Sequence, residues 1–142
     1  MDRGTRLDDD TLLAAFESTR MAPGDLRHAE HVRLAFLYLA RQADFGEAAV
    51  RFRRDLRRFA AAHGVMDRYH ETLTWAYLAL INERAHGASF ANSAEFLRRH
   101  PEVLDQDAGL LSRYYDVAAI ARSARAKEVF VLPELDAGRR EP

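Results

Sequence analysis

Three histidines are the residues of this sequence whose types and spacing could hold a metal ion. His28 and His31 lie in the segment Asp25-Leu26-Arg27-His28-Ala29-Glu30-His31, and His70 lies in Asp67-Arg68-Tyr69-His70-Glu71-Thr72. In both segments an aspartate precedes a histidine by three residues. Aspartate is a preferred cap at the start of a helix, so each segment predicts a helix with a histidine in its first turn.

The first turn of a helix favours the form of histidine that binds metals. The positive end of the helix dipole disfavours imidazolium, and neutral imidazole is the form that acts as a ligand. Three histidines with an open fourth position are typical of catalytic zinc and also suit copper or iron. We therefore expect His28, His31 and His70 to bind one divalent transition metal, Cu, Zn or Fe. Glu71 is the candidate catalytic base, and Glu30 or Glu71 could instead be a further ligand or orient one.

Two other interpretations of the histidines stay open. They can be structural, bonded to caps and to neighbouring chain, or they can perform acid–base catalysis without a metal. Thr74 and Tyr77 follow His70 at helical spacing, and Tyr38 follows His31. These three side chains could line a pocket beneath the histidines, although core residues with satisfied hydroxyls are the more common case.

A second candidate surface is the arginine-rich face predicted for residues 47–62. It carries Arg51, Arg54 and Arg58, with Arg53 and Arg57 beside them. Such a face could bind an acidic protein partner. The spacing of Glu47, Arg51 and Asp55 favours ion pairs along a solvated helix instead.

Composition narrows the classes of protein and of site. A chain of 142 residues with 48% hydrophobic residues suits one globular domain. It has no cysteine, so a thiolate metal site is excluded. The net charge of −1 provides no field that would attract nucleic acid or a membrane. The start Met1-Asp2-Arg3-Gly4 is polar, and no apolar run approaches the roughly 18 residues of a membrane span. We expect a cytoplasmic protein.

Hydrophobic periodicity then predicts the elements that must position the histidines. Helices are expected over residues 8–19, 26–41, 47–62, 68–85 and 89–99, and one or two more over 109–127. The apolar run Val129-Phe130-Val131-Leu132 could be a last helical turn or an extended segment. From Asp136 onward we expect a disordered tail.

These elements predict an all-α, compact single-domain helical bundle of five to seven helices with an extended C-terminal tail. The domain covers residues 1–142, with an ordered core over about 7–135. Residues 26–41 and 68–85 are apolar almost all round, so they should be central. Short turns make successive helices antiparallel, so these two should run parallel. Their histidine-bearing starts, with His63 nearby, should then meet at one end.

The sequence resembles a family of small bacterial proteins of uncharacterised function. The resemblance rests on residues 26–32 and 37–39, on Arg68-Tyr69-His70-Glu71-Thr72-Leu73-Thr74, on Tyr114-Tyr115 and on residues 129–133. It covers roughly residues 10–135. It implies one self-contained helical domain and points to the same two histidine segments, but it implies no reaction.

Three functions are consistent with these patterns. The first is a small metal-binding protein, or metalloenzyme, acting on a small molecule at His28, His31 and His70. The second is a protein-interaction module that uses the arginine-rich face. The third is a metal-free pocket protein that binds a small ligand at the same end of the bundle. A homodimer is compatible with so small a domain.

Overall fold

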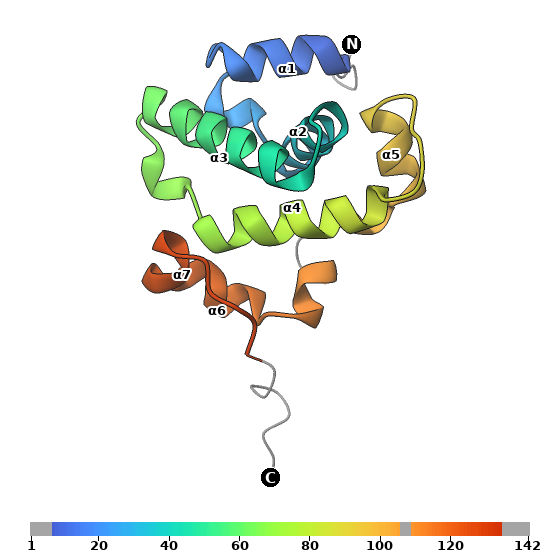
Figure 1. Ribbon diagram of the computed structural model, residues 1–142. Helices are drawn as coiled ribbons and strands as arrows, with labels where there is room; N and C mark the ends of the chain where they lie inside the picture. Colours follow the sequence, from blue (N-terminus) through green and yellow to red (C-terminus); the bar gives the residue numbers. More distant parts are fainter. Residues whose placement is uncertain (1–6, 106–108, 135–142) are drawn as a thin grey trace.

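The chain folds into helices joined by short turns (Figure 1). The computed structural model describes residues 7–105 and 109–134, and these contain α-helices and 3-10 turns but no strand. The prediction of an all-α domain of five to seven helices is confirmed; the predicted disorder from Asp136 lies outside the described residues. The α-helices are α1 (Asp9–Glu17), α2 (His28–Arg41), α3 (Phe45–Ala62), α4 (Glu71–Ala85), α5 (Ser93–Arg99), α6 (Val117–Arg122) and α7 (Ala124–Glu128). The 3-10 turns are Pro23–Asp25, Met66–Arg68, Pro101–Leu104 and Leu110–Arg113.

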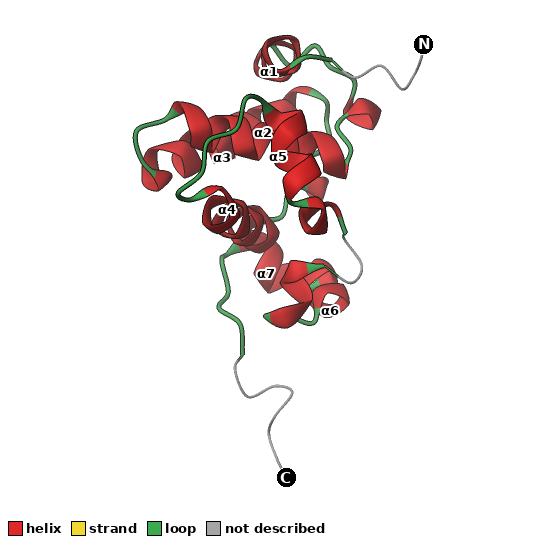
Figure 2. Ribbon diagram, turned by 90° about the vertical axis from the view of Figure 1, so that its right-hand side faces the viewer, coloured by secondary structure: helices red, strands yellow, loops and turns green. Residues whose placement is uncertain are grey.

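Helices α2 and α4 are central, as the sequence predicts. α2 packs against α1, α3, α4 and α5, while α4 lies between α2 and α3 on one side and α7 with the Leu110–Arg113 turn on the other. The predicted parallel orientation is wrong. Figure 1 looks nearly along α2 while α4 lies across the view, and Figure 2, turned by 90°, looks along α4. Short turns make helices neighbours without fixing their crossing angle, and a steep crossing is one of the ways helices pack.

The two histidine-bearing helices begin later than predicted. Asp25 and Asp67 end up within short 3-10 turns, Pro23–Asp25 and Met66–Arg68, instead of capping helices. α2 therefore starts at His28 itself, and α4 starts at Glu71 with His70 as its N-cap. Aspartate and asparagine do cap other helices: Asp8, Asp44, Asn92 and Asp116 accept a hydrogen bond from a first-turn backbone N–H.

A buried ion pair ties the helices around α2 together. Arg33, only 3% exposed, interrupts the apolar run of α2. Its Nη2 lies 3.0 Å from Asp9 of α1, and its Nε donates to the Ser93 hydroxyl of α5 at 2.8 Å. Ser93 also donates to Asp9 from both its hydroxyl and its backbone N–H. Burial alone raises the pKa of Asp9, but the hydrogen bonds from Ser93 and Arg33 outweigh it and hold that pKa below its usual value.

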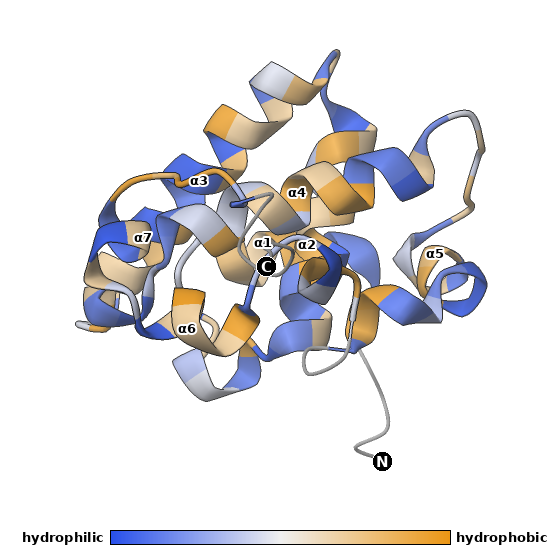
Figure 3. Ribbon diagram, turned by 90° about the horizontal axis from the view of Figure 1, so that it is seen from below, coloured by the Kyte–Doolittle hydropathy of each residue, from blue (hydrophilic) through white to orange (hydrophobic). Residues whose placement is uncertain are grey.

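The chain after α7 runs extended along α4. The Thr72 hydroxyl donates to the carbonyl of Val129 at 2.9 Å and accepts from the backbone N–H of Val131 at 3.0 Å. The Tyr115 hydroxyl donates to the Val131 carbonyl at 2.8 Å. Of the two predicted possibilities for residues 129–132, the extended segment is the correct one, and Figure 3 shows it as a hydrophobic strip after α7. None of the described helices has the length and apolar character needed to cross a membrane.

Candidate functional site: a cavity between three helices

A cavity of about 310 Å³ lies among α2, α3 and α4. Its wall is mostly apolar, and residues such as Leu78, Ile81 and Phe59 are almost fully buried and form its floor. Arg68 is the exposed residue of the described lining, so it marks the mouth. The described lining contains no aspartate, glutamate or serine. The polar side chains on the wall are His28, His31, Arg68, Tyr69, His70, Thr74 and Tyr77.

All three predicted site histidines line this cavity, although α2 and α4 cross steeply. The start of α2 brings His28 against Tyr77, two turns into α4, with ring centroids 5.2 Å apart. The steep crossing of α2 and α4, and not a common bundle end, places the three side chains on the lining of one cavity. A cluster of the three histidines remains a prediction.

His31 is a polar side chain of the wall that has no hydrogen-bond partner among the described residues. Neither of its ring nitrogens makes a hydrogen bond to another residue in the described part of the chain. Burial, with a smaller contribution from His28, lowers the pKa of His31 to about 4, and Glu30 acts in the opposite direction. His31 is therefore neutral at pH 7, with one donor and one acceptor nitrogen available to an occupant of the cavity.

His70 has both ring nitrogens occupied. Nδ1 accepts from the backbone N–H of Leu73 at 3.1 Å, which caps α4. Nε2 therefore carries the proton and donates to the carbonyl of Ile120 at 2.9 Å. The ring joins the start of α4 to α6.

His28 has one nitrogen occupied and one open. Its Nε2 donates to the carbonyl of Val103 at 3.0 Å. Burial lowers the pKa of His28 below its usual value, and this hydrogen bond acts against the shift. His63, which the sequence places at the same end, does not line the cavity; its Nε2 lies 2.7 Å from the Thr19 carbonyl.

A metal held by His28, His31 and His70 remains a prediction. In residues 7–105 and 109–134, no group of three or more His, Asp or Glu side chains is arranged to hold a metal ion. The hydrogen bonds of His70 give a physical reason against metal binding in this arrangement. A metal on Nδ1 would break the cap of α4, and a metal on Nε2 would break the bond to Ile120.

Glu71, the predicted catalytic base, lies outside the cavity lining. Its carboxylate accepts hydrogen bonds from Tyr69 at 2.6 Å, from Trp75 at 2.9 Å and from Arg53 at 2.9 Å. Burial raises the pKa of Glu71, but these three hydrogen bonds outweigh burial and hold the pKa below its usual value. A carboxylate so engaged is a poor proton acceptor. The other candidate, Glu30, accepts from the backbone N–H of Arg27 at the start of α2.

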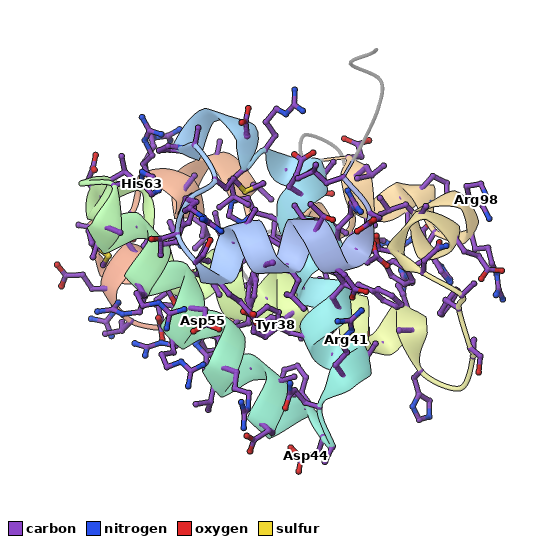
Figure 4. All side chains as sticks on the ribbon, turned by 90° about the horizontal axis from the view of Figure 1, so that it is seen from above. Tyr38, Arg41, Asp44, Asp55, His63 and Arg98 are labelled. Atoms are coloured by element: carbon purple, nitrogen blue, oxygen red, sulfur yellow. The ribbon has the colours of Figure 1, made fainter. Side chains whose placement is uncertain are left out.

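The arginines of α3 have partners within the protein. Arg51 pairs with Glu47, Arg53 with Glu71, and Arg57 lies over the Tyr69 ring. Asp55, only 3% exposed, pairs with Arg54 and Arg58, not with Arg51 as its spacing suggests. Asp55 also accepts from the Tyr38 hydroxyl at 2.6 Å, and Figure 4 labels both residues. Tyr38 is therefore a core residue with a satisfied hydroxyl, whereas Thr74 and Tyr77 do line the cavity.

For two residues of the lining, Arg68 and Tyr69, the sequence carries no signal of their position at the cavity. The sequence predicts Arg68 to be an ordinary arginine in the first turn of a helix. It lies at the cavity mouth because α4 starts later than predicted. Tyr69 reads as a core aromatic residue. The repeated aspartate-to-histidine spacing is the one signal that does point to this wall.

Comparisons with known proteins add no family to these observations. The chain matches no protein-family model, and searches of curated proteins and of solved structures find no match to it. The resemblance to uncharacterised bacterial proteins therefore stays a prediction.

Proposed function

We propose that this protein binds a small, largely apolar organic molecule in the cavity between α2, α3 and α4. The observation that carries the proposal is the pairing of an apolar cavity with a half-buried His31 on its wall that has no hydrogen-bond partner in the described part of the chain. Buried polar groups are nearly always satisfied, so each exception calls for an explanation. A ligand with one polar atom facing His31 supplies it.

Tyr77 supports the same assignment. It lines the cavity, and its hydroxyl has no hydrogen-bond partner among the described residues. Burial raises the pKa of Tyr77, and Asp105 raises it further, so the hydroxyl keeps its proton. His31 and Tyr77 together offer donors and an acceptor on an otherwise apolar wall, which is the usual composition of small-molecule pockets.

The cavity volume limits the size of the ligand. An apolar cavity of about 150 Å³ holds benzene, and the cavity here measures about 310 Å³. By proportion, the ligand has roughly ten to fourteen non-hydrogen atoms. A single aromatic ring with a short chain, or a short branched aliphatic chain, has this size.

A cavity-filling substitution tests the proposal. Ala60 lines the cavity and is buried, while its neighbour Ala61 is exposed on the same helix. We expect phenylpropanol and phenylpropanamide to bind the wild-type protein in ligand-observed NMR and to raise its melting temperature. Ala60→Leu should abolish both effects because the added side chain occupies the space.

Ala61→Leu adds the same atoms to the solvent-facing side and should bind like the wild type. The melting temperature of each variant without ligand shows that it is folded. Equal binding by Ala60→Leu and the wild type would place the ligand elsewhere. The proposal would be overturned if the wild type bound none of these neutral probes and none of the small carboxylic acids described below.

A further inference from the structure

We infer that the molecule held in this cavity is an anion, a small carboxylic acid whose carboxylate lies against Arg68 at the mouth. This inference rests on the proposed function and adds the chemical class of the ligand.

Arg68 is a cation without a counter-charge. Its side chain makes no ion pair or hydrogen bond with a residue in the described part of the chain. The arginines of α3 differ, since each pairs with a carboxylate or stacks on an aromatic ring. Arg68 is also the one charged side chain in the described lining.

The surroundings of Arg68 add positive potential. α2, with 14 residues, and α4, with 15, both begin at the cavity wall, because His28 and His70 line it. The start of a helix carries the positive end of its dipole. No acidic residue of the described lining opposes this potential.

Four acidic residues near the cavity stand outside its described lining. Asp67 precedes Arg68 in the same 3-10 turn and is exposed. Glu71 is already bonded to Tyr69, Trp75 and Arg53. Asp105 raises the pKa of Tyr77, and Glu30 raises that of His31, so each lies close enough to act on those side chains. Glu30 is already bonded to Arg27. An anion is therefore favoured at the Arg68 end and disfavoured beside Tyr77.

The length of the cavity fits a molecule with two different ends. Its wall follows α4 from His70 to Ile81, a rise of about 16 Å along the helix axis. A carboxylate at Arg68 leaves the apolar body among the apolar side chains of the lining, such as Leu73 and Leu78. An uncharged polar atom further along the body can then bond to Tyr77 or His31.

Matched acids and amides test the charge of the ligand. Phenylpropanoate, octanoate and naphthoate are each compared with their neutral amides by calorimetric titration at pH 7, where the acids are ionised. We expect at least one acid to bind the wild type about tenfold more tightly than its amide, the ratio given by one charge-assisted hydrogen bond. This preference should shrink as salt is added, because Arg68 is exposed.

Arg68→Gln should remove the preference for the acid and leave the affinity of the amide unchanged. Arg98→Gln is the control: it removes the same charge from an exposed arginine of α5 that does not line the cavity (Figure 4). It should keep the preference. Equal binding of acids and amides, or a preference that survives Arg68→Gln, would overturn the inference and leave the cavity as a site for neutral molecules. No binding of either kind would overturn the proposed function as well.

Discussion

At the scale of single residues, His31 links the cavity to the pH dependence of stability. Its pKa is about 4 in the folded protein, because it is buried, against 6.5 when exposed. Above pH 6.5 both the folded and the unfolded states hold it neutral. As pH falls below 6.5 the unfolded state takes up a proton that the folded state does not, so the free energy of unfolding decreases until about pH 4.

Replacement of His31 by Gln should therefore flatten the pH dependence. Between pH 7 and pH 4.5 we expect the wild type to lose on the order of 2 kcal/mol more unfolding free energy than His31→Gln, measured by urea denaturation at both pH values. His28 remains in both proteins, so its own lowered pKa cancels in the comparison. Identical losses in the two proteins would show that His31 is not buried as described.

His70 decides between a structural and a metal-binding function for the histidines. Asparagine is a strong N-cap, so His70→Asn should keep the start of α4 while removing the imidazole. Because both ring nitrogens of His70 are already bonded, we expect the variant and the wild type to take up zinc and copper equally in a calorimetric titration. Clearly tighter binding of either metal by the wild type would restore the three-histidine site.

At the scale of elements, the ion pair between Arg33 and Asp9 joins α2 to α1, and Ser93 of α5 is hydrogen-bonded to both residues. Removing one member of a buried pair leaves an uncompensated charge, so Arg33→Met should lower the unfolding free energy by about 3–5 kcal/mol. The ion pair between Arg41 and Asp10 is a matched control. It also joins α2 to α1, with a distance of 3.0 Å between Nη2 and the carboxylate oxygen, but both of its side chains are exposed. Arg41→Met should cost no more than about 1 kcal/mol, again by urea denaturation. Similar costs for both variants would contradict the burial of the Arg33 pair.

The helix boundaries show where local sequence signals stop being sufficient. Asp25 and Asp67 have the right type and spacing for caps, yet each lies in a 3-10 turn. The following helix starts three residues after Asp25 and four residues after Asp67. A side chain cannot cap a helix unless the backbone beyond it turns helical at once. Capping by His70 depends on Ile120 of α6, which fixes the ring from 50 residues away. No local pattern contains that information.

At the scale of the whole molecule, the sequence predicts the helical class and the two central helices because both depend on apolar periodicity. The angle at which α2 crosses α4 depends on how the side chains of both interlock, and periodicity does not encode it. The sequence does place His28, His31 and His70 near the starts of both central helices, and all three line the cavity. The hydrogen-bond partners of His28 and His70 could not be predicted. They are the backbone carbonyls of Val103 and Ile120, and every residue has such a carbonyl.

The extended segment bound to Thr72 has a consequence for synthesis on the ribosome. One side of α4 is covered by residues that follow it in the chain by some distance, with Val129 and Val131 bonded to Thr72 last of all. A nascent chain that has completed α4 must extend by 46 residues, from Ala85 to Val131, before that side can be closed. At about 5–20 residues per second this takes several seconds. During that interval one side of α4 lacks part of its cover. A chain truncated before residue 129 would keep that side of α4 partly uncovered.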